Sequence, residues 1–247
     1  MSARLTINGA VATILLDRPD QRNALDMQMC IDLEAAARQS EAAAEVRVVV
    51  IRGAGPAFCA GADLKERRTM TEDRVRERRR RAFAAYAAIE ALTKPVIAVV
   101  HGAAYGSGAE IATACDFAIA GSAATFCYPE ATRGTVGATQ RLPRIVGTRM
   151  AKDLMLTGRV IDAAEALRIG LVTRVISDAD LAATVDEVTA TIAKAPPLAL
   201  KLAKRCIDRV PFTDSAGALA NEIAAIEEVL GAGEWREGAE AFAKKDR

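Results

Sequence analysis

A glycine-rich stretch ending in an acidic residue is the part of this sequence best suited to chemistry. The stretch 106–110 (Gly-Ser-Gly-Ala-Glu) follows an apolar run, Pro95 to Val100, and precedes the small residues of 111–115. The apolar run predicts a buried strand, and the small residues predict a closely packed helix. Glycine allows a ligand to approach the backbone, and the first amides of a helix attract negative charge. Backbone donors beside the Glu110 carboxylate therefore indicate chemistry on a carbonyl group.

The same arrangement of strand and small-residue loop occurs earlier in the chain. A β-branched run, Val46 to Ile51, predicts a buried strand, and the loop 57–65 follows it. In open parallel sheets, ligands bind where the carboxyl ends of strands meet such loops. A second candidate carboxylate, Glu130, closes the segment 126–130. We expect these segments to meet at one site.

Composition excludes several classes of function. The chain has 247 residues and a formal net charge of +1, which gives no general attraction to nucleic acid or membrane. No apolar run approaches the roughly 20 residues that a membrane span requires. The single histidine, His101, weighs against a Ser-His-Asp or Cys-His mechanism, unless it is itself the base, and against a zinc site. We expect no metal.

Cysteine usage and the first residues predict a compartment. The five cysteines are scattered and form no Cys-X-X-Cys pair, which is typical of reduced thiols. No signal-peptide pattern precedes the first apolar residues. We therefore expect a cytoplasmic protein.

The pattern of apolar residues predicts one α/β body followed by helices. Residues 5–16 read as two strands joined by an Asn-Gly turn, and Asn23 reads as the N-cap of the first helix. A helix is expected over 66–92, and 162–165 has the form of a capping box. After residue 180 the pattern is almost wholly helical. We expect a core over 1–180 and a helical region over 181–247 that packs on another subunit or on the body.

An unusual density of arginine marks the predicted helix between Arg74 and Arg81. A solvated helix face is the preferred interpretation of such a run. Contact with a phosphorylated ligand and contact with nucleic acid are the alternatives. No aromatic residues alternate with the arginines, as an RNA-stacking surface would require.

Taken together, these residues resemble the enoyl-CoA hydratase/isomerase family, the crotonase superfamily. The resemblance rests on blocks in a fixed order that span essentially the whole chain. These blocks are 57–65 (Ala-Phe-Cys-Ala-Gly-Ala-Asp-Leu-Lys), 94–98 with 106–110 and 114–116, 126–130 with 139–143, and 156–159, with shorter matches at 17–19, 23–25, 237–238 and 241–242.

The resemblance implies a crotonase-like spiral of ββα units with a C-terminal helical trimerisation region, in homotrimers or dimers of trimers. It implies an acyl-CoA substrate and no cofactor beyond the coenzyme A of that substrate. The thioester oxygen would sit between the backbone N–H groups of Ala60 and Ser107, which would stabilise enolate charge. Glu110 and Glu130 would be the two acids that add water across a 2-enoyl thioester. The residues implied to contact substrate and coenzyme A are Ala60, Gly61, Ala62, Asp63, Leu64, Ser107, Phe242 and Lys245.

One departure from the family lies between the second acid and Thr139. The loop 131–138 is shorter than the Pro-Gly-Gly-rich loop that the family commonly has there, and it shapes the acyl pocket. An enoyl-CoA hydratase is the leading hypothesis. A 3,2-enoyl-CoA isomerase, which needs one carboxylate, or an acyl-CoA hydrolase on the same scaffold is the nearest alternative. A non-enzymatic CoA- or RNA-binding protein is the remote one.

Overall fold

Two sheets form the framework of the protein. The computed structural model describes residues 2–233, 235 and 236. Six strands form the larger sheet in the order β1-β2-β3-β4-β6-β9, and three form a smaller sheet in the order β5-β7-β8. In the larger sheet, every neighbouring pair is parallel except β1 with β2. The strands are β1 (Ala3–Asn8), β2 (Val11–Leu16), β3 (Val48–Gly53), β4 (Val96–Val100), β5 (Ala103–Tyr105), β6 (Phe117–Gly121), β7 (Thr125–Cys127), β8 (Ile161–Asp162) and β9 (Arg174–Ile176).

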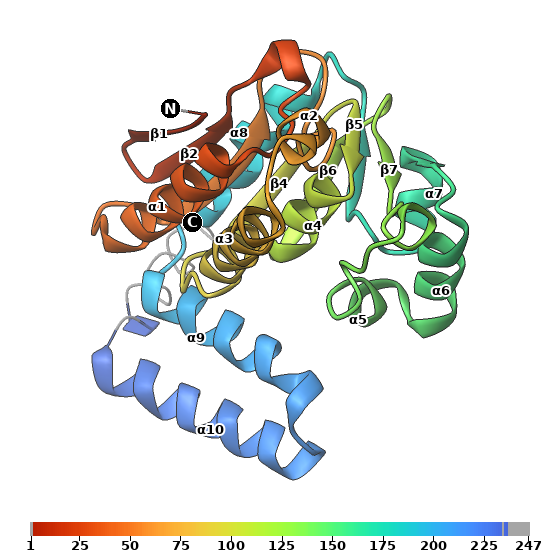
Figure 1. Cartoon of the computed structure of the whole chain (residues 1–247). Helices are drawn as coiled ribbons and strands as arrows, with labels where there is room; N and C mark the ends of the chain where they lie inside the picture. The colour runs from red at the N-terminus through yellow and green to blue at the C-terminus, as the bar shows by residue number, and fades with distance from the viewer. Residues whose placement is uncertain (1, 234, 237–247) are drawn as a thin grey trace.

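Helices cover both faces of the larger sheet (Figure 1). The α-helices are α1 (Met27–Ala42), α2 (Leu64–Arg68), α3 (Glu72–Glu90), α4 (Ser107–Ala114), α5 (Leu142–Val146), α6 (Thr148–Thr157), α7 (Ala163–Arg168), α8 (Leu181–Ala193), α9 (Pro197–Arg209) and α10 (Ser215–Ala232). Short 3₁₀ turns are η1 (Pro19–Gln21), η2 (Ala131–Arg133) and η3 (Val210–Phe212).

The two hydrophobic clusters follow from the alternation of side chains along the central strands. Val49 and Ile51 of β3 face the larger cluster, which α1, α3 and α4 complete. Val48 and Val50 face the smaller cluster, which contains Leu181 and other residues of α8. Burial on both faces explains why β3 and β4 are almost uninterrupted runs of β-branched and small residues. Helix α8 belongs to the packing of the sheet, although it follows the predicted boundary at residue 180.

Helices α9 and α10 form an antiparallel pair that extends away from the sheets (Figure 1). Their apolar side chains are incompletely covered, so this pair exposes a hydrophobic surface. Among the described residues, no helix combines the length and apolarity needed to span a bilayer.

Local sequence signals gave both correct and incorrect expectations. The hairpin is confirmed, but Asn8 is not a turn residue: it ends β1 and pairs with Val11, so the turn consists of Gly9, with a φ of 56°, and Ala10. The capping box is confirmed in part, since the Asp162 side chain accepts from the Glu165 amide at 2.7 Å. The expected helix over 66–92 is two helices, because 69–71 interrupts it and Thr71 caps α3.

Asn23 is not the N-cap of the first helix. That role belongs to Asp26, which accepts from the Met29 amide at 2.7 Å. Asn23 is fully buried with a φ of 55°, and its side chain donates to the carbonyls of Ala54 and Ala57. Asn23 therefore connects the segment before α1 to the loop that follows β3.

Candidate active site

The loop after β3 is held between two neighbours, and this fixes the direction of its amides. On one side, the Leu25 amide donates to the Gly61 carbonyl at 2.8 Å, and the Asp63 amide donates to Leu25 at 3.0 Å. On the other side, the Cys59 amide donates to Ala103 at 3.0 Å, and Tyr105 donates back to Cys59. The loop thus lies between the segment before α1 and strand β5, directly beside the start of α4.

Ala60 cannot serve as the predicted oxyanion donor in this arrangement. Its N–H donates to the carbonyl of Arg22 at 2.9 Å and is therefore already engaged. The prediction that the Ala60 amide binds the thioester oxygen is wrong, because the Arg22 carbonyl, in the segment before α1, already accepts its hydrogen bond. Ala60 does line the cavity described below.

Ala62 has the free amide instead. Ala62 forms a parallel bridge with Leu25, but the two hydrogen bonds of this bridge are made by its neighbours, Gly61 and Asp63. The N–H of Ala62 itself therefore points away from Leu25. Within the described residues, the Ala62 N–H has no hydrogen-bond partner, and Ala62 lines the cavity. The second free amide is that of Ser107, the first residue of α4, which has no acceptor within its helix. A Cβ on Gly61 would lie 4.0 Å from the Ser107 nitrogen, so the two loops are adjacent.

Both predicted acids reach the same cavity, which has a volume of about 330 Å³. Glu110 lies in the first turn of α4 and is 5% exposed, whereas Glu130 follows β7 at the start of η2. Gly137 lies against both side chains. A Cβ there would approach Glu110 Oε1 to 2.7 Å and Glu130 Cγ to 3.0 Å. The structure thus brings together two carboxyl groups from separate elements.

Burial changes the protonation of this pair. It raises the pKa of the Glu110 carboxyl from 4.5 to about 7, and the negative charge of Glu130 adds to the rise. Burial also raises the pKa of Glu130 above its ordinary value. The Oε2 atom of Glu130 is buried without a hydrogen-bond partner among the described residues. Near neutral pH the pair can hold one proton, so it can both accept and donate one.

Arg141 supports Glu110 from behind the cavity. It is 6% exposed and pairs with Glu90 Oε2 at 2.6 Å, while its other nitrogen lies 3.9 Å from Glu110 Oε2. Its guanidinium also lies over the Tyr86 ring at 5.8 Å. This charge opposes the rise in the pKa of Glu110. Sequence reasoning gave Arg141 no role, although it lies in a block that carried the family resemblance.

The predicted substrate-binding residues divide into three groups. Gly61, Ala62, Leu64 and Ser107 line the cavity with Ala60. Asp63 does not line it, because its carboxylate accepts from the first amides of α2 and pairs with Arg18 at 3.0 Å. The predicted contacts of Phe242 and Lys245 lie outside the described residues.

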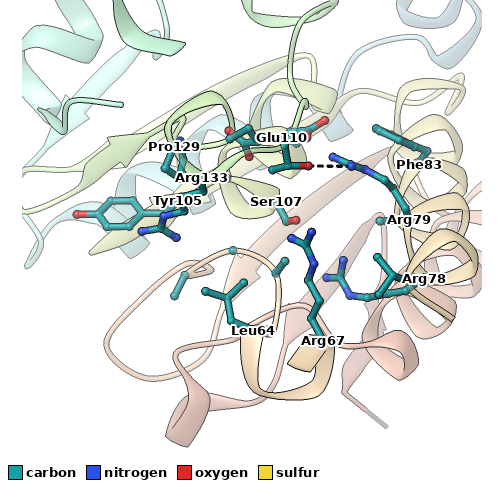
Figure 2. A pocket seen from close by; sticks show the side chains of 18 of the residues that line it. Leu64, Arg67, Arg78, Arg79, Phe83, Tyr105, Ser107, Glu110, Pro129 and Arg133 are labelled. Carbon is teal, nitrogen blue, oxygen red and sulfur yellow. Dashed lines mark hydrogen bonds between the residues drawn. The ribbon is translucent and has the colours of Figure 1, made fainter. Parts of the chain in front are cut away.

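Four arginines also line the cavity and were not predicted as site residues. They are Arg67, Arg78, Arg79 and Arg133. The charge of Arg79 lowers the pKa of Glu110, and the dashed line in Figure 2 marks the hydrogen bond of Arg79 to Thr135. The arginine run was interpreted as a solvated face, which holds for Arg76, Arg80 and Arg81 but not for Arg78 and Arg79. The positions that line the cavity from α3 are one helical turn or less apart, and that spacing could have identified them.

The single histidine and the cysteine of the loop lie apart from this chemistry. The Nε2 atom of His101 lies 2.9 Å from the carbonyl of Gly55, and His101 lines a different cavity. Cys59 is fully buried, and burial raises the pKa of its thiol to about 11. In the part of the chain that the structure describes, no three His, Cys, Asp or Glu side chains could hold a metal ion.

Comparison with known proteins agrees with this geometry. The family model for enoyl-CoA hydratase/isomerase matches residues 6–247. The chain is 39% identical to a short-chain-enoyl-CoA hydratase of Clostridium acetobutylicum over 96% of this chain and 92% of that protein. It is 36% identical to an enoyl-CoA isomerase/hydratase of Mycosarcoma maydis over 99% of this chain and 92% of that protein.

Solved structures confirm the predicted α/β fold. A crystal structure of an enoyl-CoA hydratase from Bacillus anthracis matches with a TM-score of 0.95 and 37% identity, covering 99% of this chain and 97% of that one. The sequence match and the fold match both extend over nearly the full chain. This chain belongs to the enoyl-CoA hydratase/isomerase family of the crotonase superfamily.

Proposed function

We propose that the protein is an enoyl-CoA hydratase, which adds water across the 2,3 double bond of a 2-enoyl-CoA thioester. One observation carries this proposal. Two buried carboxyl groups, Glu110 and Glu130, share one cavity with two free backbone amides. Family membership supports an acyl-CoA as the substrate.

The amides of Ala62 and Ser107 would receive the thioester oxygen. When water attacks C3, electron density moves to that oxygen, and two preorganised N–H donors stabilise the resulting enolate. One carboxylate accepts a proton from the attacking water, and the carboxylic acid of the other glutamate donates a proton to C2. The oxygen of water is then bonded to C3, and the two glutamates have exchanged one proton. The step requires no metal and no cofactor besides the coenzyme A carried by the substrate.

Purified protein and crotonyl-CoA provide the direct test. We expect the absorbance of the conjugated thioester to fall with time and 3-hydroxybutyryl-CoA to form. A panel of longer and branched 2-enoyl-CoAs extends the assay. If none of them is hydrated while another class of acyl-CoA is converted, the hydratase proposal fails.

A 3,2-enoyl-CoA isomerase is the second candidate, because the same amides and one carboxylate suffice to move a proton between C2 and C4. Incubation with a 3-enoyl-CoA distinguishes the two. An isomerase builds up the conjugated thioester, so absorbance rises and stays high. A hydratase without isomerase activity leaves that substrate unchanged.

The α9–α10 surface supports assembly into a homotrimer or a dimer of trimers. The apolar side chains exposed on these helices and the turn between them are Ile207, Val210, Phe212, Leu219, Ile223, Ile226 and Leu230. A surface of this kind is typical of a subunit interface. Light scattering coupled to size exclusion should give three or six times the 26.1 kDa chain mass. A monomer at micromolar concentration contradicts the assembly.

The cysteines support a cytoplasmic location. All five are free thiols, and four of them are buried, which suits a reducing compartment. Fractionation of cells that produce the protein, followed by immunoblotting, tests this location. Recovery from a membrane or extracellular fraction would contradict it.

A further inference from the structure

One helical face of α3 forms a wall of the cavity, and two arginines, Arg78 and Arg79, interrupt it. Val75, Ala82, Phe83 and Tyr86 line the cavity from this helix and are apolar or aromatic. Arg79 also lines the cavity, one turn after Val75 and one turn before Phe83. An apolar wall can pack against an acyl chain. The half-buried guanidinium of Arg79 in the middle of that wall can instead bind an anion.

The direct contacts of Arg79 are with neutral groups, although its positive charge also lowers the pKa of Glu110 and of Glu130. Its guanidinium donates to Thr135 Oγ1 at 2.8 Å and to the carbonyl of Val136, and it lies 5.9 Å from the Phe83 ring. None of these partners is ionised, and two of the five N–H donors of an arginine are used. Across residues 2–233, 235 and 236, Arg79 forms no ion pair, whereas the neighbouring Arg78 lies 3.7 Å from Glu66.

The position of Arg79 places that charge beside the reacting atoms. Val136, which accepts from Arg79, directly precedes Gly137, and Gly137 lies against both Glu110 and Glu130. The charge of Arg79 lowers the pKa of both Glu110 and Glu130, so its guanidinium lies within electrostatic range of the two acids. The phosphates of coenzyme A are separated from the thioester by the whole pantetheine arm. A cation this close to the two acids therefore faces the acyl group.

We propose that the acyl group of the preferred substrate carries a carboxylate, which Arg79 binds. The preferred substrate class is then a 2-enoyl-CoA derived from a dicarboxylic acid. This inference rests on the proposed hydratase function and specifies its substrate. Arg79 has two roles in this scheme, since it binds the anion and also joins α3 to the loop 131–138.

Three thioesters that differ only at the end of the acyl group test the proposal. They are glutaconyl-CoA, its neutral terminal amide, and 2-pentenoyl-CoA, which has a methyl group instead of the carboxylate. A charge-assisted hydrogen bond in a cavity should raise kcat/KM for glutaconyl-CoA about 10- to 100-fold above the other two. Equal values for all three overturn the proposal, while hydration of none of them refutes the hydratase function itself.

Variants separate the binding role from the anchoring role. Arg79→Gln should remove the preference for glutaconyl-CoA, chiefly through KM. Thr135→Val removes one anchor of the loop but keeps the charge, so it should retain the preference. Arg80→Gln is the matched control, because Arg80 is on the same helix and pairs with Glu77 at 2.7 Å in solvent. If Arg79→Gln lowers kcat/KM equally for all three thioesters, Arg79 only anchors the loop and the proposal fails.

The phosphates of coenzyme A are the other possible source of negative charge. Pantetheine thioesters of the same three acyl groups lack these phosphates. The preference should persist among them if Arg79 binds the acyl carboxylate. If Arg79→Gln instead raises KM equally for all three CoA thioesters and leaves KM for the pantetheine thioesters unchanged, Arg79 binds a phosphate and the proposal is overturned.

Discussion

Gly137→Ala is expected to disable the enzyme by separating its two acids, with little effect on the rest of the fold. The added Cβ would lie 2.7 Å from Glu110 Oε1, whereas ordinary van der Waals contact begins at 3.4 Å. The Glu110 carboxylate must therefore retreat by about 0.7 Å, which is the difference between these two distances. Glu130 must also move, because its Cγ would be only 3.0 Å away.

The cost of this displacement falls mainly on catalysis. Misplacing a catalytic group by about 1 Å costs roughly 100-fold in rate, so we expect kcat for a 2-enoyl-CoA to fall by about 30- to 100-fold. Overpacking by one methyl group costs about 1 to 3 kcal/mol of stability, which the folded state should tolerate. Initial rates from thioester absorbance and a thermal melt measure the two effects separately.

Gly231→Ala is the matched control for this substitution. Gly231 lies in α10 and a Cβ there meets no atom within 4 Å, so neither kcat nor stability should fall. If Gly137→Ala keeps the kcat of the parent enzyme, then the placement of the two acids around Gly137 does not govern the reaction. If the variant simply unfolds, its melting temperature will show that before any rate is interpreted.

Three further predictions concern the acids and the amides. Glu110→Gln and Glu130→Gln should each lower the hydration rate at least 100-fold, since hydration uses both acids, and a variant that keeps full hydration activity would contradict the paired mechanism. Replacing the amide of Ala62 with an ester, by incorporation of the matching hydroxy acid, should lower kcat about 100- to 1000-fold, whereas the same exchange at Ala60 should affect mainly stability because that N–H is engaged by Arg22. Because the pKa of Glu110 rises from 4.5 to about 7 on folding, its contribution to stability is full below pH 4.5 and is lost as pH rises through 7. Chemical denaturation should therefore show a fall in unfolding free energy of up to about 3 kcal/mol between pH 5 and 8, and Glu110→Gln should remove that component.

Local patterns in the sequence predicted most of the elements. The hairpin that turns at Gly9, the β-branched strand of 46–51 and the capping residue Asp162 each depend on interactions within a few residues. Asn23 shows where this reasoning fails. Its residue type suits an N-cap, but long-range hydrogen bonds to Ala54 and Ala57 determine its role.

The glutamate pair is the part of the site that the sequence predicted best. Glu110 and Glu130 belong to blocks whose order identifies the family, and the structure brings both to one cavity. The raised pKa of Glu110 could not be predicted, because it depends on burial and on the distances to Glu130 and Arg141. The charge on Arg79 was visible in the sequence, but its direction into the cavity was not.

The sequence by itself determined the family, the order of the elements, and the types of group available for catalysis. Only the tertiary structure decided which amide in the loop 57–63 can bind an oxyanion. Ala60 and Ala62 are chemically identical and two positions apart. Ala60 meets the carbonyl of Arg22, while the bridge to Leu25 directs the Ala62 N–H to the other side. The availability of a backbone donor depends on what packs beside it, and those neighbours come from segments distant in the sequence.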